Sequence, residues 1–239
     1  MRRHLLRLLA LLALCFVALQ AVFLLRVALM VVVDPQSTTF QRSEAWRLLV
    51  EKRQILWSQD WVPADRLSQH LQRAVIASED ATFTDHSGVE WDAIEKAWDR
   101  NQRVQARVAA NPKARVKIVG GSTITQQLAK NLLLSGERTV LRKGQELVVT
   151  LMLEGLLSKQ RILEIYLNNV EWGEGVFGAQ AAARHYFRTD AARLGPAQAA
   201  RLAVMLPAPK RFEKRPGSAY VVGRAATIQA RMDDVELPR

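Results

Sequence analysis

Cysteine is nearly absent from this sequence of 239 residues, in which Cys15 is the only one. A single thiol cannot close an intrachain disulfide, and it cannot supply the clustered cysteine ligands of a structural zinc site. The spacing of zinc fingers and the aromatic-glycine signature of ribonucleoprotein motifs are missing as well. The folded part of the chain must therefore be held by packing alone, and nucleic acid is not an expected partner.

Acidic residues are outnumbered by basic ones, 23 to 34, which gives a formal net charge of +11. A charge of this sign suits an anionic membrane surface or a phosphorylated substrate. A basic surface that only keeps the protein soluble is the simpler alternative.

Charge is missing altogether from residues 8–25, a run of 18 positions. With the apolar residues that follow, a helix of this length can cross a hydrocarbon layer of ~30 Å. Arg2, Arg3 and Arg7 precede the run, so the positive-inside rule places the N-terminus in the cytoplasm and exports the rest of the chain. A cleavable signal peptide is the alternative, but the run is longer than such a peptide needs and no A-x-A site follows it. We therefore expect an uncleaved anchor in residues 1–33.

Strand-like alternation is rare after the anchor, whereas apolar residues recur every three to four positions in several segments. This pattern predicts a mainly α-helical domain over residues 63–239, joined to the anchor by a juxtamembrane connector over residues 34–62. The connector contains "WRLLVEKRQILW", which fits either a membrane interface or a packing helix. Residues 100–118 are basic, lack acids and contain Pro112, which predicts a mobile surface segment.

The first stretch that suggests chemistry is "VIASEDATFTDHSGVEW", residues 75–91, where Glu79 and Asp80 follow an apolar helical run. Carboxylates at the C-terminal end of a helix face the negative end of its dipole, so helix stability alone would not select them. If such a carboxylate is partly buried, its pKa rises and it can act as a general acid or base. An exposed loop with ordinary acids is the alternative.

The second stretch is "GGSTITQQLAKN", residues 120–131. Its glycines permit a tight turn, and Thr123 and Gln126 have the spacing of a capping box at the start of a helix. Gln126, Gln127 and Lys130 then place hydrogen-bonding groups beside a helix N-terminus, which attracts anions. No G-K-[ST] follows the glycines, so the stretch is not a P-loop. A capped helix with a solvated face is the alternative.

The third stretch, "ERTVLRKGQELVVTLMLE", spaces Arg138, Arg142 and Glu146 four residues apart, so that they share one helix face. An arginine and a glutamate four residues apart on a helix, such as Arg142 and Glu146, usually form a weak surface salt bridge. If the three converge on a cleft instead, they would bind phosphate beside a tuned carboxylate. A fourth stretch, residues 158–187, is interpreted as scaffold, with Ser158 able to cap a helix.

Together the four stretches resemble the family 51 peptidoglycan glycosyltransferases, which polymerise lipid II. Four patterns carry the resemblance, in the family's order: E-D-x-x-F-x-x-H-x-G at Glu79, Asp80, Phe83, His86 and Gly88; G-G-S-T-I-T-Q-Q-x-x-K-N at 120–131; R-K-x-x-E at Arg142, Lys143 and Glu146; and K-x-x-I-L-E-x-Y-L-N at 159–168. Glu90 and Val119 stand where the family more often has an aspartate and a polar residue. The S-x-x-K and K-T-G patterns of the transpeptidase domain that many relatives carry occur nowhere in the sequence, so the match is to the monofunctional biosynthetic class.

The resemblance implies a mainly α fold, with a lysozyme-like globular lobe and a smaller membrane-proximal hydrophobic lobe, preceded by one N-terminal transmembrane helix. It implies that the 4-hydroxyl of one lipid II attacks the anomeric carbon of the growing chain, with inversion and release of undecaprenyl pyrophosphate. The protein would then be a single-pass protein of the bacterial inner (cytoplasmic) membrane, with its catalytic domain in the periplasm or otherwise outside the cytoplasm.

The resemblance also implies roles for particular residues. Glu79 would be the general base, and Glu146 a second catalytic carboxylate that orients the phosphate-binding cluster or stabilises charge. The substrate would be bound by Ser122, Gln126, Gln127, Lys130 and Arg138, with Lys130 and Arg138 on the phosphates. The site would be supported by Asp80, Phe83, His86 and Arg142.

Expected partners are lipid II, the growing glycan chain and membrane lipids, and proteins of cell division or cell-wall synthesis are candidates for recruitment. No cofactor is expected to be required, and no metal site made of protein ligands is expected. A divalent cation, magnesium or manganese, could bridge the pyrophosphate.

Two other functions are considered. A lysozyme-like lytic enzyme needs one carboxylic acid but has no evident use for Lys130 and Arg138. A non-catalytic, membrane-anchored scaffold of the cell wall would need neither the carboxylic acid nor the two cations.

Overall fold

The structure, a computed structural model, describes residues 2–110, 121–134, 136–137 and 139–238, with only the backbone described for residues 93, 97, 101 and 105–110. Most of these residues are helical, which confirms the predicted fold class. The helices are α1 (Arg2–Leu29), α2 (Thr39–Lys52), α3 (Gln69–Glu79), α4 (Trp91–Ala110), α5 (Ile124–Leu133), α6 (Val140–Leu156), α7 (Lys159–Asn169), α8 (Gly178–Phe187), α9 (Pro196–Met205), α10 (Pro209–Phe212) and α11 (Ala219–Gln229). The short elements are strands β1 (Ser58–Gln59), β2 (Glu171–Gly173) and β3 (Val176–Phe177) and the 3-10 turns η1 (Ala64–Arg66) and η2 (Ala191–Arg193).

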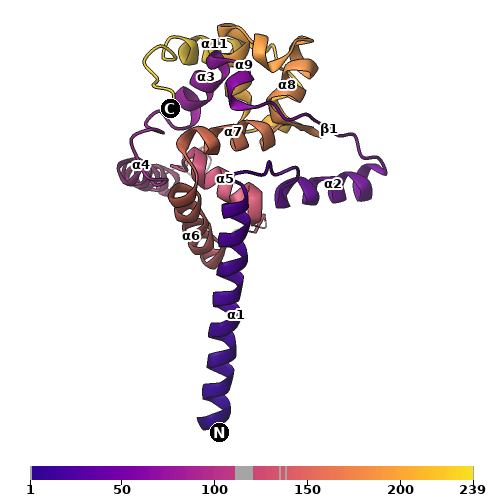
Figure 1. Ribbon diagram of the computed structural model, residues 1–239. Coiled ribbons are helices and arrows are strands. Elements are labelled where there is room, and N and C mark those ends of the chain that lie inside the picture. The colour runs from indigo at the N-terminus through magenta and orange to yellow at the C-terminus, as the bar shows by residue number, and fades with distance from the viewer. Residues whose placement is uncertain (1, 111–120, 135, 138, 239) are drawn as a thin grey trace.

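Helix α1 forms a stalk whose free end is the N-terminus (Figure 1). Its 28 residues make it the one helix, within the described part of the chain, that is long and apolar enough to cross a membrane, as predicted. The stalk joins the body at its C-terminal end, where Val27 and, just past the helix, Met30 are buried in the hydrophobic core. Helix α1 also contacts α6. At this contact the side chains of Gln20 on α1 and Gln145 on α6 exchange two hydrogen bonds of 2.9 and 3.0 Å.

Helices α3, α9 and α11 pack together at the end of the body remote from the stalk, with α7 and α8 beside them (Figure 1). Helix α5 packs against α2, α6 and α7, and so connects this group to the part near the stalk. Helix α7 begins where predicted: Ser158 accepts a hydrogen bond from the backbone N–H of Arg161, and Ile162, Leu163 and Tyr166 are buried. The likeness to lysozyme stays a prediction.

A small sheet of order β1-β3-β2 joins the chain after α2 to the chain after α7. Strand β1 is parallel to β3, and β2 is antiparallel to it. Gly175 makes the β2–β3 turn at a φ of +75°, and a Cβ there would lie 2.0 Å from the carbonyl oxygen of Leu56, so only glycine fits. The sheet places Glu171, the first residue of β2, near the part of the chain predicted to be a connector.

Helix α4 corrects one expectation. It continues to Ala110, so the first part of the predicted surface segment 100–118 is helical, and residues 111–118 lie outside the described residues. The basic residues there are spaced among uncharged ones that are compatible with a helix up to Pro112. The predicted boundaries at residues 33 and 62 stay predictions.

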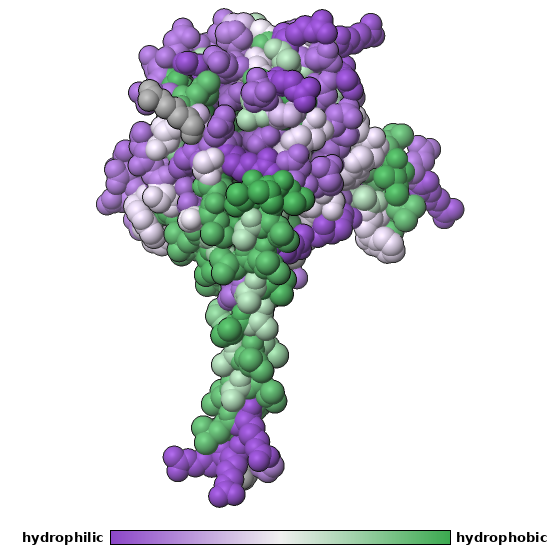
Figure 2. Space-filling view, viewed as in Figure 1, coloured by the Kyte–Doolittle hydropathy of each residue, from purple (hydrophilic) through white to green (hydrophobic). Residues whose placement is uncertain are grey.

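Apolar side chains cover the stalk and the base of the body around it, whereas the N-terminal tip is hydrophilic (Figure 2). On α6, Val140 and Leu141 are almost fully exposed, at 89% and 87%. Helix α2 carries a second apolar patch with Trp46, Leu49 and Val50, on the arm that projects to the right in Figures 1 and 2. The apolar base of the body surrounds the point from which the stalk leaves.

Candidate active site

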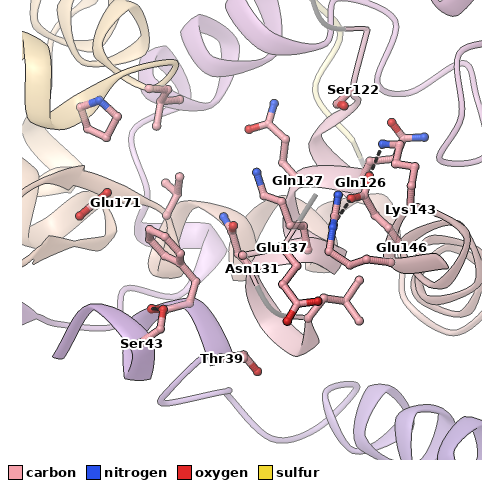
Figure 3. A pocket seen from close by; sticks show the side chains of 18 residues that line it. Thr39, Ser43, Ser122, Gln126, Gln127, Asn131, Glu137, Lys143, Glu146 and Glu171 are labelled. Carbon is pink, nitrogen blue, oxygen red and sulfur yellow. Dashed lines mark hydrogen bonds and ion pairs between the residues drawn. The ribbon is translucent and has the colours of Figure 1, made fainter. Parts of the chain in front are cut away.

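A cavity of about 640 Å³ opens between α2, α5, α6 and the start of β2. Figure 3 shows Lys143 and Glu146 on one side of it and Glu171 on the other, with Gln127 and Asn131 between them. Six of the predicted site residues line this cavity: Ser122, Gln126, Gln127, Lys130, Arg142 and Glu146. Arg138, the remaining predicted substrate-binding residue, lies outside the described residues.

Glu79 is the last residue of α3, where the sequence predicts it, and is half-buried. The side-chain amide of Gln127 donates a hydrogen bond of 2.9 Å to Glu79 Oε2, and Gln127 Oε1 accepts one of 3.0 Å from the hydroxyl of Tyr166. Because the buried Tyr166 hydroxyl must donate, the amide nitrogen of Gln127 faces the carboxylate. Glu79 is thus connected to the cavity through a glutamine that lines it.

Burial raises the pKa of Glu79 above its usual value, and the negative charge of Asp80 adds to this, while hydrogen bonds from Gln127 and Ser78 oppose it. The pKa of Tyr166 is raised well above its usual value by burial and by the nearby acids Glu79 and Asp80, so the phenol stays a donor. A carboxylate with a raised pKa is a stronger base than an ordinary one. The arrangement therefore suits proton abstraction at this position.

Asp80 connects the end of α3 to the start of α5. Its Oδ2 accepts a hydrogen bond of 2.9 Å from the backbone N–H of Ile124, and its Oδ1 lies 2.8 Å from His86 Nε2. The backbone N–H of Gly88 donates to His86 Nδ1 at 3.1 Å, so Nε2 carries the proton and donates to Asp80. Asp80 and His86 therefore position Glu79 relative to the helix that carries Gln127.

Phe83 and Gly88 pack the other side of this connection. Phe83 is fully buried, with the ammonium group of Lys159 4.5 Å from its ring centroid. The hydroxyl of Thr123 donates to the carbonyl of Gly88 at 2.6 Å. Gly88 has a φ of +84°, and a Cβ there would lie 2.7 Å from Thr150 Cγ2, so a larger residue would push α6 away.

The start of α5 has the predicted capping box. Thr123 accepts from the backbone N–H of Gln126, and the side chain of Gln126 accepts from the backbone N–H of Thr123. The Oε1 atom of Gln126 is therefore occupied by the cap, which leaves its amide nitrogen for the cavity. Lys130, one turn further along, lines the cavity from the exposed side of the helix.

Glu146 is buried on α6, at 3% exposed, although its spacing from Arg142 is that of a surface pair. Arg142 donates to its Oε2 at 2.7 Å, and the ammonium group of Lys143 pairs with its Oε1. All three side chains line the cavity. A buried carboxylate here holds two cations at the cavity wall, where a phosphate could meet them.

Sequence reasoning missed two parts of the site. Thr39, Phe40 and Ser43 line the cavity from α2, in the predicted connector, and Glu171 lines it from the stretch interpreted as scaffold. Burial raises the pKa of Glu171 to about 7. No local pattern marks these residues, because they reach the cavity only through the packing of α2 and β2 against distant segments.

One group of ligand-type residues occurs in the described part of the chain: Asp80, His86 and Glu90 have ligand atoms within 4.8 Å of one another. Both oxygens of Asp80 and both ring nitrogens of His86 already take part in the hydrogen bonds that join α3 to α5. A metal ion would have to break those bonds, so the group fits a structural role better than a metal site.

Comparison with known proteins identifies relatives along nearly the whole chain. The family model described as "Transglycosylase" matches residues 50–233. A "Biosynthetic peptidoglycan transglycosylase" of Paraburkholderia xenovorans is 51% identical over 230 residues, which are 96% of this chain and 91% of the relative. The protein of the same description from Bordetella pertussis is 56% identical over 205 residues, 86% of this chain and 82% of its own. That of Burkholderia vietnamiensis is 52% identical over 225 residues, 94% and 87% of the two chains.

Proposed function

The chain belongs to the transglycosylase family and is a peptidoglycan glycosyltransferase of cell-wall biosynthesis, and we propose that it polymerises lipid II with Glu79 as its base. One observation carries the proposal for Glu79. Its half-buried carboxyl group has a raised pKa and accepts a hydrogen bond from Gln127. Gln127 lines the cavity together with Lys130, Arg142 and Lys143, whereas Glu79 lies behind it and is not itself a lining residue. A base beside a set of cations is what transfer from a pyrophosphate requires.

In the proposed reaction, the Glu79 carboxylate takes the proton of the acceptor 4-hydroxyl of lipid II. The oxygen attacks the anomeric carbon of the growing chain, and the bond from that carbon to the pyrophosphate oxygen breaks. The electron pair leaves with undecaprenyl pyrophosphate, whose charge Lys130 and Arg138 stabilise. Direct displacement inverts the anomeric carbon, so no covalent sugar-enzyme intermediate forms.

Glu146 acts on this reaction through its neighbours. Its buried carboxylate pairs with Arg142 and Lys143, which keeps both cations at the cavity wall and limits their movement. Ser122, Gln126 and Gln127 shape the same cavity with hydroxyl and amide groups. We expect Lys130→Ala to lower the rate of transfer, because the leaving pyrophosphate loses a cation.

The class of reaction is tested with purified protein in detergent. Given lipid II, the protein should form long glycan chains, and given preformed strands it should leave their length unchanged. A lytic enzyme would shorten the strands and form no polymer, and a scaffold would do neither. Either result would end the proposal.

A further proposal concerns cofactors and metal ions at this site. No cofactor should be required, and a divalent cation would be held by the pyrophosphate itself rather than by a cage of protein ligands. Polymerisation should then continue in the presence of a chelator, at a rate within several-fold of that with magnesium or manganese. Complete loss on chelation would contradict this.

Helix α1 is long and apolar enough to anchor the protein in a membrane, and we propose that it spans the inner membrane once, with the N-terminus in the cytoplasm. Cys15 is the only cysteine, so the variant Cys15→Ser with Lys214→Cys carries one exposed thiol on the body. A membrane-impermeant maleimide added from the periplasmic side should label it in intact cytoplasmic membranes. Labelling only after lysis would show the opposite orientation.

Proteins of cell division or cell-wall synthesis are proposed as recruiting partners.

A further inference from the structure

Glu171 is a buried carboxyl group in the wall of the cavity that the proposed mechanism does not use. It opens β2, is 7% exposed, and lies on the opposite side of the cavity from Lys143 and Glu146 (Figure 3). Ser43 of α2 lies on the same side as Glu171 in that view. Acidic side chains are seldom buried unless they are paired, so the burial of Glu171 calls for an explanation from its partners or from a ligand.

The hydrogen bonding of Glu171 is incomplete. Within the described residues, no donor makes a hydrogen bond to its buried Oε1 atom. The nearest cation is the ammonium group of Lys210, 3.3 Å from Oε1, and this group is shared with the buried carboxylate of Glu44. Glu44 is in turn paired with Arg47 at 2.9 Å. Lys210 is therefore divided between two acids, and Glu171 keeps unused capacity to accept a hydrogen bond.

The charges around Glu171 explain its titration. Burial is the largest cause that raises its pKa, Glu44 and Glu213 add to the rise, Lys210 opposes it, and the net result is a pKa of about 7. Near neutral pH the group is therefore divided between its acid and its carboxylate. A phosphate would be repelled by the carboxylate form, so this side of the cavity does not suit the pyrophosphate.

The apolar part of the cavity lining suits a sugar or a peptide, and some of it is near Glu171, because α10, which begins at Pro209, packs against β2. Val170 precedes Glu171, and Phe40, Leu206 and Pro209 add apolar surface to the cavity. The hydroxyl of Ser43 supplies a second hydrogen-bonding group. A few polar groups on an apolar wall are typical of sites that bind uncharged, hydrogen-bonding ligands.

We propose that Glu171 binds the sugar-peptide part of lipid II, with its carboxylate accepting a hydrogen bond from an uncharged amide N–H or hydroxyl group of the substrate. This inference rests on the proposed function. It divides the cavity into a cationic side for phosphate and an acidic, partly apolar side for the sugar and peptide. Glu171 is then a residue of substrate binding, and Glu79 remains the base.

The test measures kcat and KM for lipid II across a pH range. Glu171→Leu should raise KM roughly tenfold while kcat changes less than about threefold, because binding is lost and the base is intact. Glu171→Gln keeps an acceptor oxygen and should raise KM by less than about threefold at neutral pH. In the wild type, KM should fall as pH rises through about 7, because the carboxylate accepts more strongly, and Glu171→Gln should lose this dependence.

Two matched variants separate substrate binding from a structural role. Lys210→Met removes the cation beside Glu171, so the fall in KM should move to higher pH, while KM on the alkaline side stays near that of the wild type. Glu174→Gln changes a nearby acid that does not line the cavity and should leave KM unchanged. Thermal unfolding checks that each variant is folded.

The inference is overturned if Glu171→Leu leaves KM unchanged, if Lys210→Met raises KM as much as Glu171→Leu at every pH, or if Glu171→Gln retains the pH dependence of KM. Each of these results requires a wild type that makes polymer. A wild type that makes none would contradict the proposed function instead, so the two failures are distinguishable.

Discussion

At the scale of single residues, the position of Glu79 is explained by chemistry rather than by stability. A carboxylate at the end of α3 faces the negative end of the helix dipole, and burial further disfavours its charge. The raised pKa means that the folded state prefers the protonated acid. The contribution of Glu79 to stability is therefore present at low pH and is lost as pH rises through its folded pKa.

Gln127 should control the pKa of this base. Its amide donates to Glu79 and favours the carboxylate, so Gln127→Leu should raise the pKa of Glu79 further. Because the base acts only when ionised, the acid limb of the pH profile of kcat/KM should move to higher pH. The measurement to compare is the pH at which the acid limb lies, and not the size of kcat/KM, because the loss of Gln127 from the cavity wall also affects substrate binding.

Tyr166→Phe is the matched control for Gln127→Leu. It removes the hydroxyl that bonds Gln127 Oε1 but leaves the amide facing Glu79. Its acid limb should move less than that of Gln127→Leu. Equal shifts in the two variants would show that Gln127 does not set the pKa through its hydrogen bond.

At the scale of secondary-structure elements, the features that depend on neighbours in sequence could be predicted. The end of α3 at Glu79, the capping box of Thr123 and Gln126, and the Ser158 cap of α7 each depend on residues within one turn. The bond from Ile124 to Asp80 joins positions 44 apart, and no local pattern indicates it. Glu171 and the α2 residues escaped prediction for the same reason.

Arg161 of α7 adds polar contacts to the chain just after α1, beside the apolar docking of Val27 and Met30. Arg161 donates to the carbonyls of Met30 and Val33 at 2.9 and 3.2 Å and pairs with Asp34 and Glu164 at 2.7 and 2.8 Å. Cations at a helix C-terminus are favourable, and here the cation also joins the anchor to the body. The stalk is therefore docked on the body and not loosely tethered.

Arg161→Ala should destabilise the protein by about 1–3 kcal/mol, because the largely buried Glu164 loses its cation and the Met30 carbonyl loses its donor, whereas Asp34 and the Val33 carbonyl are exposed enough to bind water. Thermal or chemical unfolding in detergent measures this. Arg193→Ala is the control, since Arg193 pairs with Asp190 but its side chain is 77% exposed, against 16% for Arg161. The control should lose less than ~1 kcal/mol. Similar losses in both variants would contradict the proposed docking.

At the scale of the whole molecule, the apolar surface extends beyond the anchor. The base of the body around the stalk is apolar, and the α2 arm carries a further apolar patch (Figure 2). Exposed apolar patches of this kind mark membrane or protein contacts. Helix α2 packs one face on the body, with Leu48 buried, and exposes Trp46 at 68% on another face, so we propose that this exposed face contacts the membrane.

In vesicles containing brominated lipids, the fluorescence of Trp46 should be quenched, so Trp46→Phe should remove a quenched component of the emission. The control adds Tyr220→Trp to Trp46→Phe. Tyr220 is 58% exposed on α11, at the end of the body remote from the stalk, and a tryptophan there should not be quenched. Equal quenching at both positions would show that α2 does not face the bilayer.

The identity of the base is the central claim, and an isosteric change tests it most directly. The initial rate of lipid II polymerisation should fall by a factor of roughly 10²–10⁴ in Glu79→Gln, while lipid II binding survives and the protein becomes no less stable at alkaline pH. Asp85→Asn, which changes an exposed acid of the same loop, should polymerise at the wild-type rate. Polymerisation by Glu79→Gln at a rate near that of the wild type would contradict the account.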